Sequence, residues 1–435
     1  MNQIQMNWIR QMRRWQGEFH LRLLQGAAVF VVAGASVPLL NAQVAPAKSA
    51  TYQLIFNRLD GDGDGKVTAA ELEKQGRKTT LIDSADKDGD RVLSREEVYR
   101  FFQRRVKDGP EASSEPIILV HEFPESSRVD EASCRSAAEY SASKNGYSTV
   151  VMVDGRVVFE RYDQGWGPET SHRLASGTKS FSGAILGVAV KDGLLTLDEP
   201  VADTITEWQS NEALSGISIR HLLSLTSGLD PGAPGVVPSY TDAVVISDDG
   251  EPETGPGEKF AYGPRPFQIF GEILRRKLAA DKEIGYADPL AYLEARIFEP
   301  IGLSYAEWLR DENGMPKLPS GARLTASEWC KFGELLRNGG IWGGEELLDP
   351  KVLKECLTGS SAYPGYGVTF WLLDNNPARV EKRNWIKGGF MAAGKGKQRL
   401  YVIPKTGVVV VRQGESTVFE DLEMLDLLFL KESEK

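Results

Sequence analysis

The chain has 435 residues, of which 41% are hydrophobic and 26% are charged, and its formal net charge is −10. A chain of this length is expected to form two or three domains, and its composition excludes a protein that is disordered throughout. The acidic balance argues against a basic nucleic-acid-binding surface, so no nucleic-acid partner is expected.

The first 42 residues have the three-part pattern of a secretory signal peptide. Four arginines between positions 10 and 22 precede an apolar run over 26–40, and the small residue Ala42 closes the segment. The apolar run has about 15 residues, whereas a bilayer-spanning helix needs roughly 20. We therefore expect an exported protein, periplasmic or extracellular, with no stable membrane span. An uncleaved anchor, which would make the protein a membrane-tethered sensor, is the alternative.

The first of two acidic loops, 60–71, reads DGDGDGKVTAAE and carries carboxylates at loop positions 1, 3, 5 and 12. Calcium takes roughly six to eight oxygen ligands, and the glycine at position 6 allows the sharp turn that such a loop needs. The spacing resembles an EF-hand loop. The resemblance implies calcium ligation by Asp60, Asp62, Asp64, the carbonyl of Lys66, Thr68 and Glu71.

The second acidic loop, 86–97, reads DKDGDRVLSREE and follows the same spacing. Its expected calcium ligands are Asp86, Asp88, Asp90, the carbonyl of Val92, Ser94 and Glu97. Arg91 stands where glycine is expected, and a left-handed non-glycine residue costs roughly 1 kcal/mol, so this site should be weaker. Leu93 matches Val67 of the first loop, and we expect the two to pair across a short β bridge.

Together the two loops predict a small all-α EF-hand pair over 43–106, with calcium as its cofactor. A solvated acidic turn is the alternative interpretation of each loop. If calcium binds, it has a structural or docking role, or it regulates the rest of the chain. Binding of calcium to the folded form alone would stabilise this unit by mass action.

The segment 107–127 is rich in Pro, Ser and Glu and is interpreted as a linker to the large domain 128–435. Periodicity in that domain predicts antiparallel strands with helices around them, an α+β fold. The expected elements are a helix over 130–146, a hairpin over 147–162 turning at Asp154-Gly155, a helix from Phe181 to Gly193, and a strand pair at 400–404 and 408–412.

Ser176 and Lys179 form an S-x-x-K motif in the run RLASGTKSF, at the predicted start of the helix that continues through Phe181. Residues three apart in a helix share a face, so the amine should lie beside the hydroxyl. Serine is a poor nucleophile unless a base activates it, and a desolvated lysine with a lowered pKa can serve as that base. Alone, the motif is weak, because it recurs by chance in many helices.

Further segments give the motif a context. They are DGLLTLDEPVAD at 192–203, RHLLSLTSGL at 220–229, IFEPIGL at 297–303 and LTASEWCKFGELLRNGG at 324–340. This succession resembles the group formed by class C β-lactamases, D-alanyl-D-alanine peptidases and family VIII esterases, from about residue 137 to about 415. The resemblance implies a β-lactamase/transpeptidase-like fold, with the active site between a helical subdomain and an antiparallel sheet. His221 in the second run is expected to be structural.

The group's second motif is Tyr-x-Asn, and Tyr262 in EKFAYGPRPF matches its tyrosine. Its phenol is expected to lose its proton more easily near the lysine, or to relay a proton to the leaving group. Pro264 occupies the asparagine position and offers no side-chain hydrogen bond, which puts efficient β-lactam or peptide turnover in doubt. The neighbouring Arg265 is expected either to bind an anionic group of the substrate or to form a surface ion pair.

The third motif, Lys/His-x-Gly on an edge strand, has three possible registers. Lys387-Gly388-Gly389 fits the letters, but Ala392-Ala393-Gly394 leads directly into the strand RLYVIP and is the preferred register. There a backbone N–H could complete an oxyanion hole with that of Ser176. Lys405-Thr406-Gly407 spells the motif in an apparent hairpin turn and is interpreted as structural.

These observations predict an exported serine hydrolase that acts through an acyl-enzyme on a small ester, lactam or peptide, with no cofactor for catalysis. The alternative is a calcium-dependent binding protein whose hydrolase fold has lost activity. The three cysteines, Cys134, Cys330 and Cys356, are expected to be buried thiols, and Cys330–Cys356 is the one pairing that merits a test.

Overall fold

The computed structural model describes residues 115–429 except 282–284, and, in the N-terminal part, 56, 59–74, 82, 85–95 and 97–98. The predicted signal segment 1–42 lies outside the described residues. The chain divides into two compact units, Met1–Arg105 and Val106–Lys435. In the part of the chain that is described, no helix has the length and apolarity needed to cross a membrane.

In the first unit the two acidic loops are joined by a short antiparallel ladder. β1 (Lys66–Val67) pairs with β2 (Leu93–Ser94), and Val67 lies opposite Leu93, as the sequence predicted. The helix α3 (Ala69–Lys74) continues from the first loop. Among the described residues of this unit, the buried apolar side chains that pack together with those of the ladder are Phe56, Leu59, Val67, Leu72, Ile82, Ala85, Leu93 and Val98.

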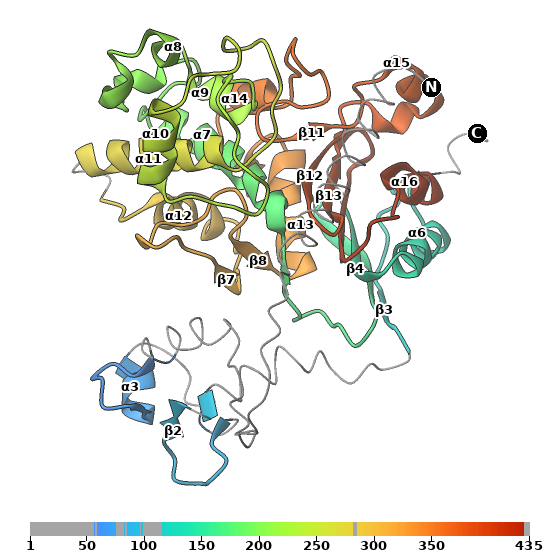
Figure 1. Cartoon of the computed structure of the whole chain (residues 1–435). Coiled ribbons are helices and arrows are strands. Elements are labelled where there is room, and N and C mark those ends of the chain that lie inside the picture. Colours follow the sequence, from blue (N-terminus) through green and yellow to red (C-terminus); the bar gives the residue numbers. More distant parts are fainter. Residues whose placement is uncertain are drawn as a thin grey trace, which may run out of the picture. The chain divides into compact units, whose positions relative to one another are not determined.

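The second unit is built on a seven-stranded antiparallel sheet in the order β11-β12-β13-β14-β4-β5-β3 (Figure 1). Its strands are β3 (Ile117–Val120), β4 (Gly146–Val153), β5 (Arg156–Tyr162), β11 (Trp371–Leu372), β12 (Phe390–Gly394), β13 (Gln398–Ile403) and β14 (Val408–Gly414). The predicted hairpin is confirmed: β4 and β5 turn at Asp154 and Gly155, which both have positive φ. The predicted pair β13–β14 is confirmed as well.

Both faces of this sheet are buried around its middle strand β14, in which residues 408–411 are four consecutive buried valines. Val409 and Val411 of β14 face one core with Trp329 of α13 (Ala326–Arg337), whereas Val408 and Val410 face the other. In that second core α6 (Glu131–Ser143) packs beside α16 (Asp421–Phe429), as Figure 1 shows. Successive side chains of a strand point to opposite faces, and each buried valine contributes about 1.5–3 kcal/mol.

The helical subdomain surrounds α7 (Phe181–Lys191), whose residues 181–189 are all buried. A helix that is apolar on every side belongs in a core, and the others cover it. Those other helices are α8 (Glu212–Ser215), α9 (Ile219–Leu223), α10 (Tyr240–Asp248), α11 (Arg265–Ala280), α12 (Pro289–Leu293), the π-helix η4 (Glu294–Phe298) and α14 (Pro350–Cys356).

The remaining elements are short. They are β6 (His172–Arg173), β7 (Glu307–Trp308), β8 (Ala322–Leu324), β9 (Ile341–Trp342), β10 (Glu345–Glu346), α15 (Pro377–Lys382) and the 3₁₀ turns η1 (Ala175–Ser180), η2 (Val201–Asp203), η3 (Thr206–Trp208), η5 (Asn384–Ile386) and η6 (Pro404–Thr406). The strands β6, β8 and β7 form a small sheet that borders η1 in sequence.

Two expectations are settled by this fold. The predicted linker 107–127 is wrong over Ile117–Val120, which forms the edge strand β3 and pairs with β5. Four consecutive branched apolar residues have a β propensity that outweighs their Pro- and Ser-rich surroundings. All three cysteines are buried free thiols, so no Cys330–Cys356 disulfide forms. Burial raises the pKa of the Cys356 thiol to about 12, which keeps it unreactive.

Candidate functional site

The candidate nucleophile, Ser176, lies on the 3₁₀ turn η1 that leads into α7, and not within the α-helix itself as predicted. In a 3₁₀ turn residues i and i+3 eclipse each other, so Lys179 still lies on the side of Ser176. The preceding residue, Ala175, has φ 48°, a left-handed conformation that costs a non-glycine residue about 1–3 kcal/mol. The Thr178 hydroxyl holds this bend by donating to the Ala175 carbonyl at 2.7 Å.

The side chain of Lys179 is buried, with 4% of the residue exposed. Its Nζ is hydrogen-bonded to Ser176 Oγ at 3.2 Å and donates to the Pro319 carbonyl at 3.1 Å. It also lies 5.2 Å from the ring centre of Tyr262. Burial disfavours the charged amine and lowers its pKa to about 7. A neutral lysine can accept the serine proton, so the amine is suited to act as a general base.

Tyr262 approaches the same serine from the loop that precedes α11. Burial raises the pKa of its phenol, whereas a hydrogen bond with Ser176 and the positive charge of Arg399 lower it. The pKa is raised overall, so the phenol keeps its proton at neutral pH. Of the two roles expected from the sequence, easier deprotonation is therefore contradicted, and donation of a proton to a leaving group fits. The structure thus brings Ser176, Lys179 and Tyr262 together.

The end of β12 lies directly against the serine turn. A Cβ added to Gly394 would be 2.0 Å from the carbonyl oxygen of Leu174 and 3.1 Å from the amide nitrogen of Gly177. Only glycine permits this approach, because any side chain would collide with backbone atoms. The preferred register of the third motif, which includes Ala393 and Gly394, is therefore the one beside Ser176.

The other two registers of the third motif lie elsewhere on the chain. Lys387 is exposed on the turn between η5 and β12. Lys405 belongs to η6, the turn between β13 and β14, where Gly407 has φ 71°. The structural interpretation of the third register is confirmed.

Arg265 and His221 both have structural partners. Arg265 donates through Nη1 to the Asp230 carbonyl at 2.8 Å and forms an ion pair with the Asp230 carboxylate at 3.1 Å. Of its two expected roles, the ion pair is the one that the structure forms. His221 caps α9, because its Nδ1 accepts a hydrogen bond from the Ser218 backbone N–H at 3.1 Å. The structural role predicted for His221 is confirmed.

An aromatic wall adjoins Tyr262, and the sequence analysis did not identify it. The wall consists of five aromatic rings: Phe260, Tyr262, Tyr363, Tyr366 and Trp371. The distance between ring centroids is 5.6 Å for Tyr262 and Trp371, 5.0 Å for Trp371 and Tyr366, and 4.7 Å for Phe260 and Tyr363. Tyr366 is buried, whereas the other four rings are half-buried. The signal for this wall is the run YPGYGVTFW at 363–371, but nothing in that run alone points towards residue 262.

The two acidic loops of the first unit each gather carboxylates at one point. One oxygen from each of Asp60, Asp62 and Glu71 lies within 4.8 Å of the others, and Asp86, Asp88 and Glu97 converge in the same way. Asp64 and Asp90 accept hydrogen bonds from the backbone N–H groups of Lys66 and Val92. An all-oxygen, carboxylate-rich set of this kind suits a hard cation such as calcium.

Backbone geometry in the second loop agrees with the weaker calcium binding that its sequence predicts. Arg91 has φ 60°, the left-handed conformation that glycine would adopt without strain. Its backbone N–H donates to Asp86 at 2.8 Å, just as that of Gly65 donates to Asp60 at 3.0 Å in the first loop. The two loops therefore share one backbone design.

Comparison with known proteins relates the second unit to a protein family. The sequence model of the Beta-lactamase family matches residues 130–423. The 6-aminohexanoate-dimer hydrolase of Paenarthrobacter ureafaciens is 21% identical over 341 residues, which span 70% of this chain and 79% of the relative. Ser176, Lys179 and all strands of the large sheet except β3 fall inside the residues that the family model matches.

Two solved structures share the fold. A penicillin-binding protein homologue from Caulobacter crescentus superimposes with a TM-score of 0.57 and 17% identity, over 73% of this chain and 100% of that one. EstCE1, a hydrolase with promiscuous acyltransferase activity, gives a TM-score of 0.55 and 17% identity over 68% and 99%. Since the family match covers more than half of the sequence, the chain belongs to the β-lactamase family, a group of serine hydrolases.

Proposed function

We propose that this protein is an exported serine hydrolase that cleaves an ester or amide through an acyl-enzyme on Ser176. The observation that carries the proposal is the buried Lys179 amine, hydrogen-bonded to Ser176 Oγ at 3.2 Å with a pKa lowered to about 7. A base with a pKa near the working pH is the most effective proton acceptor.

In the proposed mechanism, neutral Lys179 accepts the Ser176 proton as Oγ attacks the substrate carbonyl. The resulting oxyanion is stabilised by the backbone N–H of Ser176 and by one at the end of β12, next to Gly394. Tyr262 then donates its proton to the leaving group, and the phenolate regains a proton from Lys179. Water attacks the acyl-enzyme with the same groups acting in reverse, which releases the acid and restores Ser176.

Esters are the favoured substrates within this proposal. Pro264 cannot supply the side-chain hydrogen bond to a substrate amide that asparagine would supply, so lactams and peptides should react less efficiently. The half-buried rings of the aromatic wall suit an apolar group on the substrate. One relative of the chain is named a 6-aminohexanoate-dimer hydrolase. A panel of esters, cephalosporin-like lactams and D-alanyl peptides decides between the substrate classes.

Within the same proposal, the first unit is an EF-hand pair that binds calcium. The converging carboxylates of both loops and the Val67–Leu93 ladder support it. Asp60, Asp62, Asp64, Lys66, Thr68 and Glu71 would hold one ion, and Asp86, Asp88, Asp90, Val92, Ser94 and Glu97 the other. The ion would order the loops and would take no part in acyl transfer.

A fluorophosphonate probe tests the enzymatic proposal. We expect it to form an adduct with Ser176 in the full-length protein, detected by mass spectrometry, and Ser176→Ala should abolish both the adduct and ester turnover. If the protein binds calcium but forms no adduct and hydrolyses no ester, it is instead a calcium-dependent binding protein whose hydrolase fold has lost activity.

A further inference from the structure

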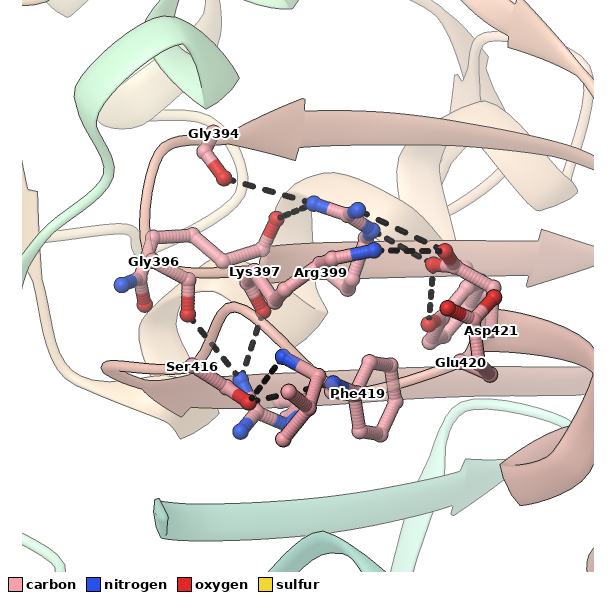
Figure 2. Close-up of polar contacts among 12 residues, drawn as sticks. Gly394, Gly396, Lys397, Arg399, Ser416, Phe419, Glu420 and Asp421 are labelled. Atoms are coloured by element: carbon pink, nitrogen blue, oxygen red, sulfur yellow. Dashed lines mark hydrogen bonds and ion pairs between the residues drawn. The ribbon is translucent and has the colours of Figure 1, made fainter. Parts of the chain in front are cut away.

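An ion pair between a buried arginine and a half-buried aspartate lies next to the end of β12, which carries the third motif. Arg399 of β13 has a side chain that is 9% exposed, and its Nε donates to the carboxylate of Asp421 at 2.5 Å (Figure 2). Asp421 is the first residue of α16 and also accepts a hydrogen bond from the hydroxyl of Tyr401 at 2.7 Å. The Asp421 carboxylate thus holds the Arg399 guanidinium on the face of the sheet that α6 and α16 cover.

The other arm of Arg399 reaches the end of β12. Its Nη1 donates to the Gly394 carbonyl at 3.3 Å and to the Gln398 carbonyl at 2.9 Å, and Figure 2 shows the Gly394 carbonyl directed towards the guanidinium. In a trans peptide the carbonyl and the following N–H point in opposite directions. The N–H of Lys395 therefore points away from Arg399, while Gly394 itself lies against the turn that carries Ser176.

Arg399 also acts on Tyr262 through its charge. It lowers the pKa of the phenol, in opposition to burial. Two other titratable side chains lie beside the ring of Tyr262: Lys179, with its Nζ 5.2 Å from the ring centre, and Tyr366, with its ring centre at 6.4 Å; of these two only Lys179 can carry a positive charge. The Arg399 guanidinium therefore acts on two parts of the site: it binds the backbone at the end of β12, and its charge lowers the pKa of the Tyr262 phenol.

Stability alone is a poor explanation for this arrangement. Removing two charges from water costs about as much as their attraction returns, so a buried ion pair adds little net stability over apolar side chains of the same size. What an arginine can do here, and an apolar side chain cannot, is bind a carboxylate and a peptide carbonyl at once with a planar group.

We propose that Arg399, held by Asp421, is a positioning residue for acyl transfer. It fixes the Gly394–Lys395 peptide against the serine turn so that the Lys395 N–H serves as an oxyanion donor. The inference rests on the proposed function, and it adds a residue that does not touch the substrate. It also assigns to α16, at the end of the chain, a part in shaping the site.

The test compares Arg399→Gln, Arg399→Lys and Asp421→Asn with the control Asp426→Asn. Asp426 lies on the same helix and forms its own ion pair with Arg383 at 2.5 Å. For each full-length variant, kcat and KM for a p-nitrophenyl ester, the pH profile and the melting temperature are measured. We expect Arg399→Gln to lower kcat at least tenfold, with KM changed less than about threefold, because a misplaced donor weakens only the transition state.

The pH profile separates positioning from folding. In Arg399→Gln the alkaline limb should move to higher pH, because the phenol loses a neighbouring positive charge. Arg399→Lys keeps the charge but cannot bind both partners, so kcat should fall while the limb stays in place. If Arg399→Gln does not fold, Arg399→Lys and Asp421→Asn decide the question through kcat.

Unchanged kcat in the Arg399 variants, or a loss that Asp426→Asn reproduces with the same drop in melting temperature, would overturn the inference and leave the hydrolase intact. A wild-type protein without ester turnover or a Ser176 adduct would overturn the proposed function and this inference with it.

Discussion

At the scale of single residues, the chemistry of the site depends on how deeply Lys179 is buried. Burial lowers the pKa of its amine. The amine is held in place by neutral partners, the Ser176 hydroxyl and the Pro319 carbonyl. An acidic neighbour would have stabilised the charged amine and raised its pKa, so the amine would stay protonated at neutral pH and could not accept the serine proton.

The pH dependence of turnover follows from this. Since burial lowers the pKa of Lys179 from 10.5 to about 7, the amine is protonated and inactive below that pH. Ester hydrolysis should therefore rise as pH increases through about 7, and Lys179→Met should lower kcat/KM by roughly 10²–10⁴. Steady-state rates from pH 5 to 9 check both points. Lys387→Met serves as the matched control, because its side chain is exposed and should leave the profile unchanged.

Gly394 is the residue where sterics can be tested most simply. In Gly394→Ala the new Cβ would have to avoid the Leu174 carbonyl oxygen at 2.0 Å, so β12 must move away from the serine turn. We expect turnover to fall at least tenfold, with the effect mainly on kcat. Gly216→Ala is the control, since an added Cβ there has no atom within 4 Å. Equal activity in the two variants would contradict the placement of the third motif.

At the scale of elements, the sequence predicted what is local and missed what forms by long-range packing. The Asp154-Gly155 hairpin and the apolar helix from Phe181 could be predicted because turn residues and periodicity lie within a few positions. The strand β3 was missed because the strand it pairs with, β5, lies about forty residues away in sequence, as the pairing of Val120 with Phe159 shows. Arg399 was missed because an arginine in a strand has no local signal for a partner such as Asp421.

The aromatic wall is an element-scale feature with a testable consequence for specificity. Trp371 lies on the edge strand β11 and is half-buried beside Tyr262. Trp371→Ala should lower kcat/KM for phenylacetyl or benzoyl esters by roughly tenfold more than for acetyl esters, because burial and stacking of an aromatic group are worth about 1.5 kcal/mol. Side-by-side kcat/KM values for the two ester classes test this. An equal loss for both would mean that the wall only supports Tyr262.

At the scale of the whole molecule, the chain divides into two compact units. The family match begins at residue 130, so the acidic loops lie outside the part that the β-lactamase family explains. Each unit has its own apolar core, with Phe56, Val67 and Leu93 in that of the first. A cation that binds only the folded form of the first unit would add to the stability of that unit.

Calcium removal tests this division of the molecule. At a calcium concentration 100 times its dissociation constant, binding to the folded form alone would add about 2.7 kcal/mol, so EDTA should lower the melting temperature of the first unit. Glu71→Gln should have a larger effect than Glu97→Gln, because the strain at Arg91 already weakens the second loop by roughly 1 kcal/mol. Calorimetric titration and melting of the full-length protein measure both effects, with ester turnover followed in parallel.

If EDTA lowers the melting temperature of the first unit but leaves ester turnover unchanged, the role of calcium is structural. If turnover falls together with the melting temperature, the ion regulates the hydrolase. An unchanged melting temperature without calcium uptake would contradict metal binding.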